Sequence, residues 1–162
     1  MGCSCGTLFS MRARQATLDD LEALMSMQLK LWPDAGRADL EPHARAILEG
    51  RPRSTLPLTL FVAEEPEEPE VIGFVEVGLR SHADGCDESR PVGFIEGWFV
   101  EEPHRKQGVG RALIAAAEEW CRQQGCAEVA SDTWIDHEDS QRAHAALGFE
   151  VVDRCVHFRK SL

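Results

Sequence analysis

A chain of 162 residues, 43% of them hydrophobic, is long enough to form one domain with its own core. Its formal net charge of −11 disfavours binding to nucleic acid or to an anionic membrane, and it favours a cationic ligand. No apolar run approaches the roughly 20 residues of a membrane span, and no basic segment followed by an apolar one opens the chain, so we expect a cytoplasmic protein.

A regular pattern of strands and helices begins at Met11. We interpret residues 1–10 as an extra segment, disordered or left over from expression, and residues 11–162 as a single domain. Periodicity and turn residues predict ten elements in this order: strand 11–16, helix 17–31, helix 42–48, strand 58–63, strand 71–79, a strand through Phe94, a helix to about Gln123, strand 128–133, helix 138–147 and a last strand from Phe149. Hairpins mixed with crossovers predict an α/β (α+β) fold, with a mixed, mostly antiparallel sheet flanked by helices.

The strand through Phe94 runs into the loop Arg105-Lys106-Gln107-Gly108-Val109-Gly110 and then into an Ala- and Leu-rich helix. Two glycines allow a sharp turn, the helix points its positive dipole end at the loop, and Arg105, Lys106 and Arg111 add full charges. The pattern predicts a pyrophosphate site, with an ordinary strand-turn-helix joint as the alternative. It lacks the Lys-Ser/Thr of a P-loop and the third glycine of a dinucleotide fingerprint.

This loop resembles the acetyl-CoA motif of the GNAT superfamily of N-acetyltransferases, and the resemblance implies the GNAT fold. Most of residues 11–162 is similar to the bacterial aminoglycoside 6′-N-acetyltransferases. The matching pieces are Lys30–Trp32, Gly93–Gly97, Ser131-Asp132, the acidic loop 136–139, His144–Phe149 and Phe158–Lys160. The resemblance implies acetyl-CoA-dependent acetylation of the 6′-amino group of aminoglycosides, by direct transfer in a ternary complex, and hence antibiotic resistance.

Acetyl transfer to an amine requires an uncharged nitrogen, donors for the developing oxyanion and a proton source for the thiolate. Carboxylates attract a polycationic substrate, but they also raise the pKa of its amines. One carboxylate acting as a base through water, with others acting as clamps, would reconcile these demands.

Glu96 is the first candidate, because a carboxylate is uncommon in an otherwise apolar strand. The alternative is an edge-facing or hydrogen-bonded glutamate. Strand alternation would place Glu96 and Trp98 on one face, with Ile95, Gly97 and Phe99 on the other.

Asp132 is the second candidate, since the end of a strand is where open α/β sheets place ligand-binding groups. An Asx turn or a helix cap is the alternative. The resemblance adds Asp153, on the expected last strand, as a further acidic contact. Trp32 could stack on a sugar face beside Asp34, with core packing as its alternative.

The remaining candidates concern the coenzyme and the leaving thiolate. The chain has no tyrosine, whereas many GNAT enzymes use one to protonate the thiolate; His144 occupies the corresponding position, with a structural hydrogen bond as its alternative. Trp120 and Trp134 are assigned to packing. The loop and the resemblance together predict that CoA contacts Trp98, Phe99, Val100, Arg105, Lys106, Gln107, Gly108, Val109, Gly110, Arg111 and His137.

Six cysteines show no CxxC or zinc-type spacing, so no metal is expected. The family commonly pairs as homodimers, and the apolar C-terminal strand offers an edge for pairing; a covered edge within one subunit is the alternative. Two other functions stay open: an N-acetyltransferase for a polyamine or a protein N-terminus, and a non-catalytic CoA- or aminoglycoside-binding module.

Overall fold

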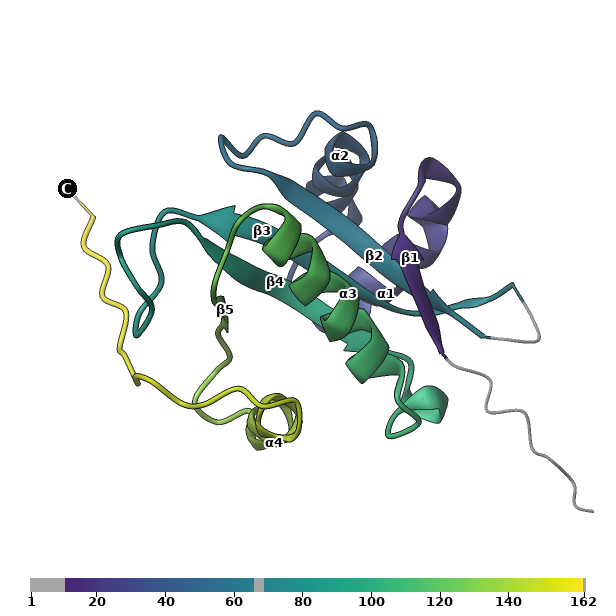
Figure 1. Ribbon diagram of the computed structural model, residues 1–162. Helices are drawn as coiled ribbons and strands as arrows, with labels where there is room; N and C mark the ends of the chain where they lie inside the picture. The colour runs from purple at the N-terminus through teal and green to yellow at the C-terminus, as the bar shows by residue number, and fades with distance from the viewer. Residues whose placement is uncertain (1–10, 66–68, 162) are drawn as a thin grey trace, which may run out of the picture.

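The computed structural model describes residues 11–65 and 69–161, so segment 1–10 and its interpretation lie outside the described residues. Within them, one five-stranded sheet has the order β1-β2-β3-β4-β5 (Figure 1). The strands are β1 (Arg12–Gln15), β2 (Leu58–Glu64), β3 (Val71–Arg80), β4 (Val92–Val100) and β5 (Val129–Ser131). The pairs from β1 to β4 are antiparallel, and β4 and β5 are parallel. The expected mixed, mostly antiparallel sheet is confirmed.

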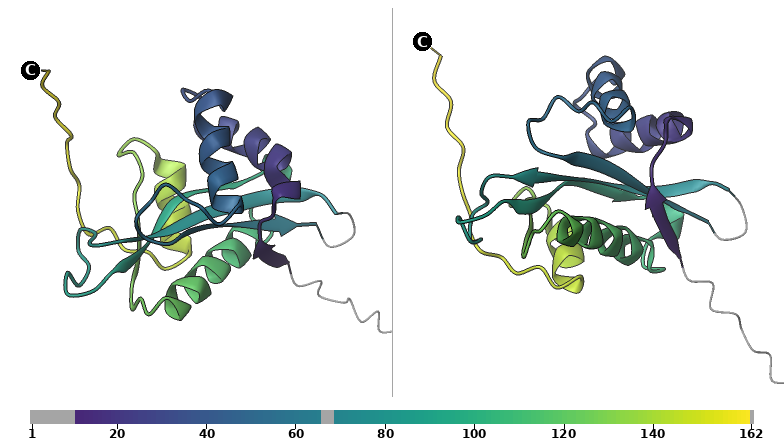
Figure 2. Two further views of the ribbon diagram at one scale, coloured as in Figure 1. Left: turned by 90° about the horizontal axis from the view of Figure 1, so that it is seen from above. Right: turned by 45° about the horizontal axis from the view of Figure 1, so that its top comes forward.

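Helices cover both faces of this sheet (Figure 2). They are η1 (Leu18–Asp20), α1 (Leu21–Leu31), α2 (Arg37–Leu48), η2 (Glu102–His104), α3 (Val109–Gln123) and α4 (Glu138–Ala146). One buried cluster lies between the sheet and α3, and a second lies between the sheet and α1 and α2. The sheet therefore has an α3 face and an α1/α2 face.

The start of α1 is held by a buried carboxylate. Asp20 is 5% exposed, accepts a hydrogen bond from the Thr17 backbone at 2.7 Å, and is bound through both oxygens by Arg14 at 2.8 Å. The bonds from Arg14 keep the pKa of Asp20 below its ordinary value despite the burial. This arrangement fixes the direction of α1, which ends at Leu31, just before Trp32.

Helix α2 begins at Arg37, so its expected start at Pro42 was wrong. The carboxylate of Asp39 accepts a hydrogen bond from the Gly36 backbone at 3.3 Å and helps to cap the helix five residues earlier. Pro42 lies inside α2, so the helix lacks the one hydrogen bond that a backbone N–H at this position would donate.

The last strand expected from Phe149 is absent: residues 149–161 form no strand. Their apolar side chains give them strand propensity, but a strand also needs a hydrogen-bonded neighbour. The segment runs outward from the rest of the molecule (Figure 1), and it exposes Val151 by 70%, Val152 by 63%, Val156 by 75% and Phe158 by 93%.

Of the cysteines that the structure describes, Cys121 and Cys126 are buried, Cys86 is half-buried and Cys155 is exposed, all as free thiols. Burial raises the pKa of Cys121 to about 12, so this thiol is unreactive at neutral pH.

Candidate active site

The loop between β4 and α3 turns sharply before the helix begins. Lys106 and Gly108 have positive φ values of 61° and 93°. A side chain at Gly108 would meet no atom within 4 Å, so the surface there is open. Val109, 1% exposed, anchors the helix start, and the backbone N–H groups of its first turn have no acceptor within the helix. With exposed Lys106 and Arg111 beside them, these donors suit an anion.

Two polar side chains of this loop are occupied in shaping it. Arg105 donates from Nε to the backbone carbonyl of Val100 at 2.9 Å. Gln107 donates from Nε2 to the carbonyl of Pro103 at 2.7 Å. Both were predicted to contact CoA, and in this geometry their evident role is to hold the loop for its backbone donors.

A β-bulge interrupts β4 at the centre of the sheet. Glu76 of β3 lies opposite Gly97 while Val77 lies opposite Ile95, so Glu96 is the extra residue. The expected alternation was therefore wrong beyond Ile95. Gly97 faces the α1/α2 side together with Glu96 and Phe99, whereas Trp98 turns to the α3 face with Ile95.

Strands β4 and β5 separate at the bulge, directly before Glu96. Their pairing ends where Ile95 lies opposite Ser131, and β4 continues alone to Val100. The backbone edge of Trp98, Phe99 and Val100 on that side is thus free of a neighbouring strand among the described residues. These three residues are among those predicted to contact CoA.

Glu96 is not a free carboxylate. Arg80, near the end of β3, donates to both of its oxygens at 3.0 and 2.6 Å, and the same guanidinium lies 3.3 Å from the centroid of the Phe94 ring. The Glu96 side chain retains 28% exposure. It can therefore meet a ligand, but only in competition with a cation that belongs to the protein.

Trp32 follows α1 and packs over the bulge. A side chain at Gly97 would lie 2.5 Å from its indole, and its ring lies 6.3 Å from that of Phe74. The indole is half-buried, and it packs on Gly97, the residue that follows Glu96. Asp34 is exposed in the turn that follows.

Asp132 is exposed directly after β5, at the opening between the separating strands. Trp134, assigned to packing, is 73% exposed, and this assignment was wrong. Trp120 is half-buried against the α3 core as expected. A large exposed indole two residues from Asp132 is a surface that sequence reasoning missed.

His144 of α4 holds the helix to the sheet. Its Nδ1 lies 2.8 Å from the Ser140 carbonyl, which can only accept, so Nδ1 carries a proton. Its Nε2 lies 3.0 Å from the hydroxyl of Ser131, and the ring packs between Trp98 and Phe149. With both nitrogens engaged, the geometry favours the structural alternative.

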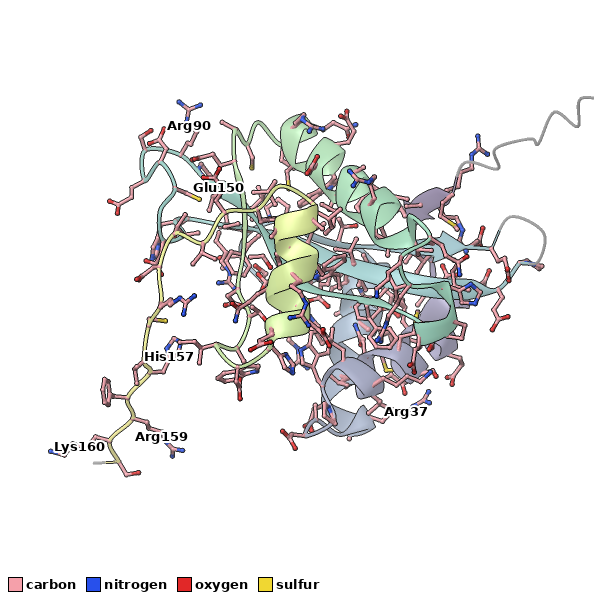
Figure 3. All side chains as sticks on the ribbon, turned by 90° about the horizontal axis from the view of Figure 1, so that it is seen from below. Arg37, Arg90, Glu150, His157, Arg159 and Lys160 are labelled. Carbon is pink, nitrogen blue, oxygen red and sulfur yellow. The ribbon has the colours of Figure 1, made fainter. Side chains whose placement is uncertain are left out.

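Two other predicted residues lie in exposed positions around α4. His137 caps the start of that helix, where its carbonyl accepts from the Gln141 backbone at 3.1 Å. Asp153 lies on the outward-running C-terminal segment, so this chain does not bring it to Glu96. Figure 3 shows Arg159 and Lys160 near the end of the same segment, far from the rest of the molecule.

Three residues near the bulge were missed from the sequence: Arg80, Glu76 and His43. Glu76 carried the signal that identified Glu96, a carboxylate inside an apolar strand, VIGFVEVGL. It is 4% exposed, and its Oε1 lies 2.7 Å from Nε2 of His43 on α2.

No cluster of three or more His, Cys, Asp or Glu side chains suited to a metal occurs in the part of the chain that the structure describes. No helix within residues 11–65 and 69–161 is both long and apolar enough to span a membrane.

Known proteins are similar to this chain in both sequence and architecture. The model of the acetyltransferase (GNAT) family matches residues 21–149. The aminoglycoside N(6′)-acetyltransferase type 1 of Serratia marcescens is 42% identical over 145 residues, covering 89% of this chain and 94% of that protein. The enzyme of the same name from Stenotrophomonas maltophilia is 40% identical over 149 residues, 92% of each chain.

Solved structures agree with these relatives. AAC(6′)-Iy, in complex with the bisubstrate analog CoA-S-monomethyl-acetylneamine, superposes with a TM-score of 0.83 at 35% identity, covering 94% of this chain and 99% of that one. Apo AAC(6′)-IG from Acinetobacter haemolyticus gives 0.82 at 29% identity, with 94% and 99% covered. This chain therefore belongs to the GNAT family of acetyltransferases, and within it to the aminoglycoside 6′-N-acetyltransferases.

Proposed function

We propose that this protein transfers the acetyl group of acetyl-CoA to the 6′-amino nitrogen of aminoglycosides, and so confers resistance to them. The observation that carries the proposal is the open backbone loop at the start of α3, beside the stretch of β4 that continues past its pairing with β5. A related protein with the same architecture holds an analog that joins CoA to an aminoglycoside.

Acetyl-CoA fits this geometry in two parts. The pyrophosphate would lie over Gly108 against the first-turn N–H groups of α3, with Lys106 and Arg111 nearby. The pantetheine arm would pair with the free edge of β4 from Trp98 to Val100. That edge also offers a backbone donor for the thioester carbonyl as negative charge develops on its oxygen.

The cationic acceptor would approach from the side of Glu96. This carboxylate, Asp132 and the indole of Trp32 together offer two anionic partners and an apolar face for an aminosugar. Direct attack in a ternary complex then requires alignment of the amine with the thioester. His144 acts here through its packing on Trp98.

We propose further that the protein is a cytoplasmic homodimer. Acetyl-CoA is a metabolite of the cytoplasm, and the described cysteines are free thiols, as is usual there. Among the residues that the structure describes, strand β5 has a neighbour on one side only, and the exposed apolar segment 149–161 is suited to pair across a subunit boundary. Light scattering is expected to give the mass of two chains, and Phe158→Asp to shift it toward one; a monomeric parent protein contradicts the pairing.

Purified protein mixed with acetyl-CoA is expected to release CoA thiol when kanamycin or tobramycin is added. NMR of the product should place the new acetyl group on the 6′ nitrogen. Turnover with a polyamine or peptide and none with 6′-amino compounds would reassign the acceptor. Binding of both ligands without product would identify a non-catalytic module.

Asp132→Asn serves as the matched variant in that assay. Loss of one charge-assisted contact is expected to lower kcat/KM for the antibiotic by roughly 10- to 100-fold. The Kd of acetyl-CoA should stay unchanged. A parallel loss of kcat/KM for the antibiotic and of affinity for acetyl-CoA would indicate a folding defect.

A further inference from the structure

A buried carboxylate paired with a half-exposed histidine lies beneath the bulge and takes no part in the assignments above. Glu76 of β3 is 4% exposed, and its Oε1 lies 2.7 Å from Nε2 of His43. Its second oxygen, Oε2, is buried without a hydrogen-bond partner among the described residues. An apolar side chain would suit this position better if stability were its only purpose, because buried ion pairs are weak stabilisers.

The pair is placed next to the expected site of reaction. Glu76 lies directly opposite Gly97, the residue that follows Glu96 in the bulge and packs on Trp32. Gly78 lies two residues after Glu76 on β3, and a side chain there would come within 3.8 Å of the Glu96 carboxylate. His43, Glu76 and Glu96 thus converge from α2, β3 and β4 on the α1/α2 face.

The geometry also settles which nitrogen of His43 can take up a proton. A carboxylate accepts, so the neutral ring donates Nε2–H to Glu76 and keeps its lone pair on Nδ1. The His43 side chain is 41% exposed, so water reaches the ring. A histidine oriented in this way by a carboxylate is the arrangement of a general base.

The charges around the ring act in known directions. The hydrogen bond to Glu76 raises the pKa of His43 above its ordinary 6.5, against the effect of burial, and the charges of Glu76 and Glu96 add to the rise. Arg53, in the loop after α2, opposes it. Glu96 is itself paired with Arg80 and so is less available as a base.

We propose that His43, oriented by Glu76, is the proton acceptor for the amine that becomes acetylated, acting through an intervening water. The amine nitrogen forms its bond to the acyl carbon, and the carbon–sulfur bond breaks with its electron pair leaving on sulfur. The ammonium proton passes to the water, which passes one to Nδ1. Solvent later protonates the thiolate and takes the proton from His43. This inference rests on the proposed acetyltransferase function.

The test is the pH dependence of the acetylation rate in single turnovers, with kanamycin and acetyl-CoA saturating. His43→Gln keeps a donor for Glu76, and it is expected to slow the step by about 100-fold or more and to remove its acidic limb. Glu76→Gln is expected to move that limb to lower pH, because the hydrogen bond that raises the His43 pKa is weakened. Arg53→Gln is expected to move it to higher pH.

Two controls separate this role from a structural one. Melting temperature and the Kd of acetyl-CoA should stay near wild type in His43→Gln, and added imidazole should restore part of the rate in His43→Ala. If the wild-type protein turns over and His43→Gln keeps the same acidic limb, the inference about His43 is overturned while the proposed function stands. Absence of wild-type turnover would instead count against the proposed function.

Discussion

Gly108→Val is expected to weaken acetyl-CoA binding by at least about 100-fold. The space above Gly108 is open, with no atom within 4 Å of an added side chain. The proposed pyrophosphate needs that space, and its contacts there are to backbone N–H groups that a valine would cover. Isothermal titration calorimetry with acetyl-CoA measures the change.

Gly125→Val is the matched control for this substitution. Gly125 follows the other end of α3, has a positive φ of 84° and is equally open, with nothing within 4 Å. Both valines therefore carry the same strain, about 1–2 kcal/mol in unfolding free energy. Only the change at Gly108 should affect the Kd; equal losses of affinity in the two variants would show that strain, and not the lost cradle, is responsible.

Glu96→Gln is expected to lower kcat/KM for an aminoglycoside by about 100-fold, more than the loss of one attractive charge alone. The reason is Arg80, whose guanidinium bonds both Glu96 oxygens. Without the carboxylate, that guanidinium becomes an unpaired cation beside the position of a cationic substrate. Steady-state kinetics with the antibiotic varied at saturating acetyl-CoA reports the loss.

The double variant Arg80→Gln/Glu96→Gln distinguishes this explanation from a simple lost contact. Removing the guanidinium as well should recover about tenfold of kcat/KM relative to Glu96→Gln, so the two substitutions are not additive. A double variant weaker than Glu96→Gln would show that Arg80 serves the antibiotic in another way.

The loop and the sheet could be predicted because their signals are local. The glycine-rich run from Arg105 to Gly110 has its turn and helix start where the sequence indicates them. The order of strands and helices followed from periodicity, apart from the start of α2. The segment from Phe149 failed because strand propensity says nothing about the presence of a pairing partner.

The site was predicted less well, because its geometry depends on contacts between distant segments. The bulge at Glu96 arises from the register of β4 against β3, which no pattern within β4 reveals. His43 resembles any helical histidine until α2 packs over Glu76, 33 residues away in the sequence. The size of Trp134 is typical of a core residue, but size alone does not reveal that its side chain is exposed.

The extra residue in β4 means that the site depends on residue count as much as on residue identity. Beyond Ile95, every side chain of the strand owes its direction to one unpaired position. In a regular ladder, with Glu96 itself opposite Glu76, Trp98 would lie opposite Phe74, and its indole would turn away from α3 toward the space held by Trp32. During evolution, the residues of this stretch can therefore change far more freely than its register against β3.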